Sequence, residues 1–257
     1  MGYMVTADTD IGISKKTNQD SVCIRIADTA SGQIVMAVMC DGMGGLSKGE
    51  VASASVVMEF EKWFEEKLPY CYQRISWEKL ANEWEGMLKR LNAKIMKYGK
   101  KFEENIGTTV TAILIMNDKY MSVNVGDSRL YRIRPGRNIR QLTQDQTLVQ
   151  QEVNKGLLTL EEARKDPRKN ILLQCIGASK NIYPEIRFGR IEGKSTYMLC
   201  SDGLRNELGE DEMAQQLIPG MLHSKEDMHN GAVALIEKAK ERQEKDNISV
   251  ILIRTEE

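Results

Sequence analysis

The run Ile34-Val35-Met36-Ala37-Val38-Met39-Cys40 is entirely apolar, and it ends abruptly at Asp41-Gly42-Met43-Gly44-Gly45. A short apolar run that is bounded by glycines predicts a strand buried on both faces. Immediately after it, Ser47-Lys48-Gly49-Glu50 matches a capping box and predicts a helix from Ser47 to about Lys67. Asp41 is therefore predicted at the end of a buried strand, in a tight turn whose glycine permits a positive φ or the close approach of another group.

Acids recur at the ends of apolar stretches along the chain. They are Asp20, Asp41, Asp127, Asp202 and Asp246, beside Ser21, Gly42, Gly126, Gly203 and Asn247 respectively. If the strands lie side by side, these acids can meet at one edge, where clustered carboxylates need a compensating cation. Oxygen ligands suit Mg²⁺ and Mn²⁺, and two such ions can activate a water molecule at neutral pH. The alternative is that each acid only shapes a turn, because aspartate is common in turns.

The alternation of apolar and polar residues predicts about ten strands and four substantial helices. The strands are expected at residues 3–7, 22–27, 34–40, 107–116, 120–125, 130–133, 171–176, 184–191, 197–200 and 248–253. The helices are expected as two pairs, 47–67 with 77–95 and 210–217 with 225–240. This order predicts an α+β fold, a four-layer α-β-β-α sandwich of two antiparallel sheets flanked by helix pairs. We expect one domain over residues 1–257, because no linker or repeat divides the chain.

The polar segment from about 144 to 168 differs from the rest of the chain. It contains two short helical patterns, and Thr159-Leu160-Glu161-Glu162 is a capping box for the second. The segment is too long for a turn and too polar for the core. We therefore expect it to be a surface insert that shapes a site.

The composition excludes several classes of function. Lys and Arg number 36 against 37 Asp and Glu, so charge gives no support for a nucleic-acid or membrane partner. The five cysteines are scattered without a CxxC pair, which argues against a zinc site or a disulfide framework and favours the cytoplasm. No apolar run reaches the roughly 18 residues of a membrane span. His223 and His229 lack helical metal-pair spacing, and neither a nucleophile elbow nor a P-loop occurs.

Eight short motifs in order resemble those of the metal-dependent Ser/Thr protein phosphatases of type 2C, in their compact bacterial form. They are Asn18-Gln19-Asp20, Asp41-Gly42-Met43-Gly44-Gly45, Gly107-Thr108-Thr109, Val125-Gly126-Asp127-Ser128-Arg129, Leu142-Thr143-Gln144-Asp145, Ile176-Gly177, Ser201-Asp202-Gly203-Leu204 and Asp246-Asn247-Ile248-Ser249. The resemblance covers essentially the whole chain. It implies a hydrolase of phosphoserine and phosphothreonine in proteins, with a two-metal centre of Mn²⁺ or Mg²⁺ at one edge of the sandwich.

The resemblance also implies roles for individual residues. Asp41 would bridge both ions, and the carbonyl of Gly42 would bind one of them. Asp202 and Asp246 would complete the other ion, and Asp20 would hold metal-bound water. Asp127, with Asp202, matches a third and weaker metal position. A hydroxide bridging the two ions would attack phosphorus directly, and the segment 144–168 would be the mobile flap of the family.

The chain departs from the family pattern at three positions. Lys15 stands where the family usually has a phosphate-binding arginine, Met43 where animal members have a histidine, and Gln146 where a histidine is usual. Lysine binds phosphate as a point charge without the bidentate fork of arginine. Because all the metal-binding acids are kept, we expect activity. Two alternatives are a weak or inactive pseudophosphatase that acts as a binding module, and a phosphatase for a small molecule.

The expected partner is a phosphorylated protein, either a Ser/Thr kinase or the targets of such a kinase. This expectation comes from bacterial signalling by analogy. We expect the chain to be a cytoplasmic monomer.

Overall fold

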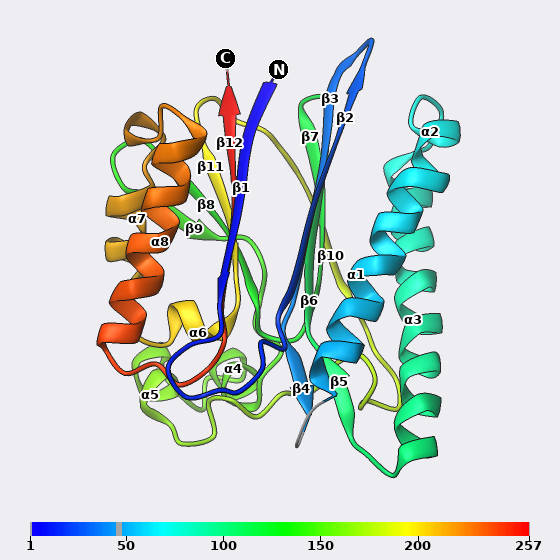
Figure 1. Cartoon of the computed structure of the whole chain (residues 1–257), viewed down its shortest axis with the longest axis vertical. Coiled ribbons are helices and arrows are strands. Elements are labelled where there is room, and N and C mark those ends of the chain that lie inside the picture. The colour runs from blue at the N-terminus through cyan, green and yellow to red at the C-terminus, as the bar shows by residue number, and fades with distance from the viewer. Residues whose placement is uncertain (1, 45–47, 257) are drawn as a thin grey trace.

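Two five-stranded antiparallel sheets lie face to face in the computed structural model, which describes residues 2–44 and 48–256 (Figure 1). The first sheet has the order β1 (Gly2–Asp10), β12 (Ile248–Glu256), β11 (Thr196–Cys200), β8 (Arg129–Arg134) and β9 (Asn138–Gln141). The second has the order β10 (Glu185–Arg190), β7 (Lys119–Val125), β6 (Val110–Met116), β3 (Gly32–Cys40) and β2 (Ser21–Thr29). The strands β4 (Gly42–Gly44) and β5 (Ile106–Thr108) pair with each other as a separate two-stranded sheet.

Helices cover the outer face of each sheet. In Figure 1, α1 (Gly49–Glu66) and α3 (Trp77–Phe102) stand beside the second sheet, with the short α2 (Leu68–Cys71) between them in the chain. The first sheet is covered by α7 (Glu210–Leu217) and α8 (Lys225–Glu241), which are joined through η1 (Pro219–Met221). The predicted four-layer α-β-β-α sandwich is therefore confirmed.

The central strand β3 shows why the layers form. Its residues from Ile34 to Cys40 are all buried. Alternate side chains face opposite sides of a strand, so Met36, Val38 and Cys40 pack under the helices, whereas Val35, Ala37 and Met39 pack between the sheets. The uninterrupted apolar run is thus explained by burial on both faces.

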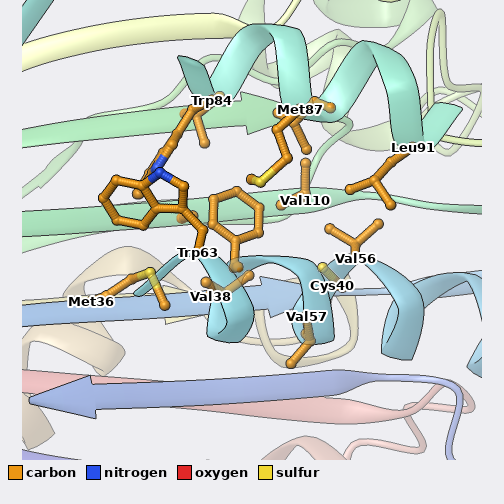
Figure 2. Packing of buried hydrophobic residues seen from close by; sticks show 14 of the residues in the cluster. Met36, Val38, Cys40, Val56, Val57, Trp63, Trp84, Met87, Leu91 and Val110 are labelled. Atoms are coloured by element: carbon orange, nitrogen blue, oxygen red, sulfur yellow. The ribbon is translucent and has the colours of Figure 1, made fainter. Parts of the chain in front are cut away.

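Aromatic side chains fill the space between the second sheet and its helices. Figure 2 shows Trp63 of α1 and Trp84 of α3 above Met36 and Val38 of β3. The two indole rings meet edge to face with their centroids 5.4 Å apart, an arrangement that the aromatic quadrupole favours. The tryptophans of α1 and α3 therefore form part of the packing surface between helices and sheet.

Several local predictions differ from the structure. The helix predicted from Ser47 begins at Gly49 with Lys48 as N-cap, and Ser47 itself lies outside the described residues. The glycine turn after Asp41 forms strand β4, because Gly42–Gly44 pairs with β5. The strand predicted at 171–176 makes only two isolated bridges, from Leu172 and Ile176. Strand β9 was not predicted, because its mostly polar residues lie at the edge of the sheet and do not alternate clearly with apolar ones.

Two helices, α4 (Leu148–Asn154) and α5 (Leu160–Lys165), form in the polar segment 144–168. The capping box at Thr159 is present, with Glu162 as its partner. Both helices lie at the end of the sandwich opposite the chain termini, near the short helix α6 (Asp202–Arg205) (Figure 1). The functional role of this segment as a flap, and the single domain, stay predictions.

None of the helices in the described ranges combines the length and the apolar character that crossing a bilayer requires.

Candidate active site

The strand register brings the predicted acids to the same end of the sandwich. Ser21 pairs with Cys40, so Asp20 and Asp41 adjoin each other at the ends of β2 and β3. Cys200 pairs with Val250, which puts Asp202 and Asp246 at the matching ends of β11 and β12. Asp127 follows β7 at this same end, because Val110 pairs with Val125. The convergence that the sequence left open is therefore present in the fold.

The backbone around Asp41 is fixed by two threonines. The amide of Asp41 donates to Oγ1 of Thr109 at 3.0 Å, and its carbonyl accepts from the amide of Thr109 at 2.9 Å and from Oγ1 of Thr108 at 2.9 Å. Sequence reasoning had matched Thr108 and Thr109 to a family motif but had given them no role. Thr108 ends β5 and Thr109 follows it, so both can hold the turn that carries Asp41.

Gly42 is needed for close packing and not for a positive φ. A Cβ at this position would lie 2.4 Å from the carbonyl oxygen of Gln19 and 2.5 Å from that of Gly49. Gly42 is also absent from the glycines of positive φ in the described chain. Of the two reasons predicted for this glycine, only the close approach applies.

The acids raise one another's pKa. Burial raises the pKa of Asp41 well above its usual range, and the charges of Asp20, Asp202, Asp127 and Asp246 add to this effect. Burial raises the pKa of Asp20 to about 7, although nearby Ser249 and Ser201 oppose the shift. The pKa of Asp202 is also raised, first by burial and then by Asp246, against the effect of Arg205. Uncompensated negative charge therefore accumulates at this edge.

Three carboxylate oxygens at this edge are buried without a hydrogen-bond partner among the described residues. They are Oδ1 and Oδ2 of Asp20 and Oδ1 of Asp202. The hydroxyls of Ser201 and Ser249 lie near Asp20 without meeting hydrogen-bond geometry; that of Ser201 accepts from the amide of Ser249, and that of Ser249 bonds to the hydroxyl of Thr9. Buried carboxylate oxygens without a donor are costly, so a cation would stabilise the site.

The acids lie at one edge of the sandwich but do not by themselves form a complete set of metal ligands. In the part of the chain that the structure describes, no three His, Cys, Asp or Glu side chains are arranged so that they alone could hold a metal ion. Hydrated divalent ions such as Mg²⁺ retain several waters and use only one or two carboxylates. The unpaired oxygens and the shared negative charge of Asp20, Asp41 and Asp202 therefore fit hydrated divalent ions.

Lys15 is positioned at the rim of the acid cluster. Its Nζ lies 2.7 Å from Oδ1 of Asp246, and both side chains are about 40% exposed (40% and 39%). Partial burial acts to lower the pKa of Lys15, but the pairing with Asp246, supported by the charges of Asp41 and Asp202, raises it. The ammonium group is therefore kept charged beside the acids.

The loop that carries Lys15 is anchored by Asn247, whose importance the sequence did not reveal. The buried amide of Asn247 accepts from the backbone amide of Gln19 at 2.9 Å and donates to the carbonyls of Ile11 at 2.9 Å and Thr17 at 3.2 Å. Gly12 packs against the same segment, because a Cβ there would lie 2.2 Å from the carbonyl oxygen of Asp246. Three hydrogen bonds from one side chain thus join two distant segments.

Asp127 is neutralised within the protein. Its carboxylate accepts a 2.7 Å hydrogen bond from Arg205 of α6. A second buried acid, Asp145, binds Arg129 through two hydrogen bonds of 2.8 Å and 2.7 Å. Burial acts to raise the pKa of Asp145, but the Arg129 pairing outweighs it and lowers that pKa. Arg129 was quoted from the sequence within a motif but given no role, and Arg205 was not mentioned.

Gln146 has a structural role. Its side-chain Oε1 accepts from the backbone amide of Gly126 at 2.8 Å, and its backbone amide donates to the carbonyl of Gly126 at 2.9 Å. The side chain thus holds the turn before Asp127.

Histidines and cysteines were set aside from catalysis, although Cys40 and Cys200 lie close to Asp41 and Asp202. His223 and His229 are exposed, and His229 contacts Asp8 at 2.5 Å. All five cysteines in the described chain are free thiols, and four of them are buried. Burial raises the pKa of Cys40 and Cys200, which opposes formation of a nucleophilic thiolate.

Known proteins resemble this chain over most of its length. Residues 13–236 match the family model described as protein phosphatase 2C. The chain is 31% identical to the serine/threonine phosphatase stp of Listeria monocytogenes over 218 residues, which cover 84% of this chain and 82% of that protein.

Solved structures of phosphatases share the fold. The S. agalactiae serine/threonine phosphatase superposes with a TM-score of 0.85 at 29% identity, covering 99% of this chain and 100% of that one. The catalytic domain of the phosphatase PstP, in complex with two manganese ions, superposes with a TM-score of 0.76 at 26% identity over 98% and 97% of the chains.

Proposed function

Because this chain belongs to the protein phosphatase 2C family and is a protein serine/threonine phosphatase, we propose that it hydrolyses phosphoserine and phosphothreonine at the edge formed by Asp20, Asp41, Asp202 and Asp246. One observation carries the proposal. Acids from separate strands meet there, raise one another's pKa, and include buried oxygens without a donor among the described residues. The charged form of this arrangement is therefore stabilised by a compensating cation.

The proposed cofactor is a pair of Mn²⁺ or Mg²⁺ ions. Asp41 and the carbonyl of Gly42 would hold them on one side, Asp202 and Asp246 on the other, and Asp20 would orient bound water. Such ions supply a nucleophile at neutral pH and offset charge on phosphate oxygens. The manganese ions of the related PstP catalytic domain support this choice.

Lys15 is proposed to bind the substrate phosphate. Its ammonium group is charged, about 40% exposed and beside Asp246, so it can donate to an incoming phosphate oxygen. Thr108 and Thr109 keep Asp41 in place while substrate binds. The leaving seryl or threonyl oxygen takes its proton from water, because Met43 beside Asp41 has no acidic proton.

The physiological context is proposed by analogy with the family. The substrates would be phosphorylated proteins in bacterial signalling, with a Ser/Thr kinase or its targets as partner. The protein would act as a monomer in the cytoplasm.

Hydrolysis of a phosphothreonine peptide tests the proposal. We expect turnover with Mn²⁺, its loss in EDTA, and a decrease of at least about 100-fold in Asp41→Asn, because a metal ligand is removed. The matched control is Asp211→Asn on the exposed first turn of α7, which should keep full activity. Equal rates under all conditions would reject the proposal. Mn²⁺ binding without turnover of any phosphoprotein would select the binding-module alternative.

A further inference from the structure

Arg205 is the last residue of the one-turn helix α6, which begins at Asp202. Its guanidinium reaches across to the end of β7, where Nη2 donates to Oδ2 of Asp127 at 2.7 Å and to the backbone carbonyl of Asp127 at 3.0 Å. The two side chains are only 11% and 6% exposed. Arg205 and Asp127 therefore form a buried ion pair between segments 78 residues apart.

The carboxylate of Asp127 depends on this arginine. Burial raises the pKa of Asp127 to about 6, Arg205 acts to lower it, and the charge of Asp202 acts to raise it. A buried carboxylate is stable in its charged form only when a cation pairs with it. Arg205 provides that cation permanently, since a guanidinium does not lose its proton in proteins.

The neighbouring cation is already engaged elsewhere. Arg129 makes two hydrogen bonds to Asp145 and one to the hydroxyl of Tyr131 at 2.7 Å. Arg205 lies 3.9 Å from Asp145, beyond hydrogen-bond distance. The hydrogen bonds therefore form two pairs, Arg129 with Asp145 and Arg205 with Asp127, while the charge of Arg205 also acts on Asp145 and Asp202.

A divalent ion does not fit at Asp127 in this arrangement. It would have to share the carboxylate with a guanidinium whose Nη2 lies 2.7 Å from Oδ2, and two positive groups on one buried carboxylate repel each other. The pairing of Asp127 with Arg205 is therefore incompatible with the third metal ion that the family resemblance implies at Asp127.

We propose that Arg205 takes the place of a third metal ion at Asp127, so that the protein binds two divalent ions and supplies the third positive centre itself. The inference rests on the two-ion centre of the proposed function. It makes Arg205 a positioning residue that holds Asp127 and the N-terminus of α6 together. Through α6 it also fixes the backbone of Asp202.

The test counts bound Mn²⁺ per chain by equilibrium dialysis and metal analysis, on folded protein checked by thermal melting. We expect two ions for the unchanged protein and for Arg205→Lys, which keeps the charge. Arg205→Gln should bind three, because Asp127 then lacks its cation, and Arg205→Gln with Asp127→Asn should return to two. The matched control is Arg164→Gln, since Arg164 is an exposed arginine of α5, and it should bind two.

Three ions in the unchanged protein, or two in a folded Arg205→Gln, would overturn the inference. If Arg205→Gln does not fold, the number of Mn²⁺ ions bound by Asp127→Asn tests the inference instead. An unchanged count of two supports the pairing with Arg205, whereas the loss of one ion overturns it. Failure of the proposed function looks different, because the unchanged protein would then bind no ion, and this result would also overturn the count of two ions inferred here.

Discussion

At the scale of single residues, the site depends on a lysine where a stronger phosphate ligand is expected. Lys15 is partly exposed and its ammonium group contacts Asp246 at 2.7 Å. A lysine offers a point charge, whereas arginine offers two parallel donors to one phosphate. If Lys15 binds the substrate phosphate as proposed, its single ammonium group would limit how tightly that phosphate is held.

Replacing Lys15 by methionine should raise KM for a phosphothreonine peptide by roughly tenfold, because a charge-assisted hydrogen bond contributes about 1.5–3 kcal/mol. Lys15→Arg should lower KM relative to the unchanged protein. Steady-state kinetics at saturating Mn²⁺ measure both effects. The neighbouring Lys16→Met, also at an exposed lysine, serves as control, and an equal KM in Lys15→Met and Lys16→Met would refute the role.

Gly42→Ala tests the close packing beside Asp41. A Cβ would lie 2.4 Å and 2.5 Å from two backbone oxygens, which flexible side chains cannot relieve, so the substitution should destabilise the fold by about 1–3 kcal/mol or more. Activity should fall as well, because Asp41 is adjacent. Gly220→Ala is the control, since a Cβ there meets nothing within 4 Å. Urea unfolding compares the two variants, and equal midpoints would contradict the packing account.

At the scale of elements, Asn247 connects the start of β12 to the loop between β1 and β2. Its three hydrogen bonds of 2.9, 2.9 and 3.2 Å cross about 230 positions of sequence (228, 236 and 230). The Asp-Asn pair was recognised as a motif, but this tether was invisible because its partners are backbone atoms far away in the chain. Sequence patterns report local periodicity and not such contacts.

Asn247→Ala should lower the free energy of unfolding by about 2–3 kcal/mol, because each lost hydrogen bond contributes about 1 kcal/mol. Urea denaturation measures the change. Asn138→Ala, at the exposed start of β9, should change stability by less than about 0.5 kcal/mol. A difference of less than about 0.5 kcal/mol between the two variants would show that the tether contributes nothing.

The elements that were predicted well are those with strong periodicity or full burial. The apolar run 34–40 and the alternation at Val22, Ile24 and Ile26 each gave a strand, because burial leaves a direct pattern in sequence. Residues 171–176 were predicted as a strand and form only isolated bridges. The difference arises because an apolar segment can pack under neighbouring segments without pairing along its length.

At the scale of the whole molecule, the sandwich brings strand ends from distant parts of the chain to one edge. The sequence allowed the prediction that Asp20, Asp41, Asp127, Asp202 and Asp246 could converge there. It did not allow the prediction that Asp127 pairs with Arg205, because that contact joins residues 78 positions apart. Convergence follows from topology, whereas the pairing of charges depends on side-chain packing.

The acid cluster predicts how metal ions and pH affect stability. Asp20 has a pKa of about 7 in the folded state against 3.8 as the ordinary value, so the folded protein holds more protons than the unfolded chain between those pH values. This contribution to stability is therefore present at low pH and is lost as pH rises toward 7. Divalent ions compensate the deprotonated acids, so Mn²⁺ should stabilise more at pH 8 than at pH 5.5.

Thermal melting in Mn²⁺ and in EDTA measures this effect. At 100 times its Kd, one bound ion adds about 2.7 kcal/mol, which corresponds to a rise in Tm of roughly 5–10 °C for a chain of this size. We expect that rise at pH 8 and a much smaller one at pH 5.5. Equal shifts at both pH values, or a shift that persists in Asp41→Asn, would disagree with a metal centre at these acids.

The most direct test of the central claim is a crystal structure determined after soaking with Mn²⁺, with the ions located by anomalous scattering. We expect two anomalous peaks that share Asp41, one of them also near the carbonyl of Gly42, and no peak at the carboxylate of Asp127. A structure with no peak at Asp41 would contradict the proposed metal centre.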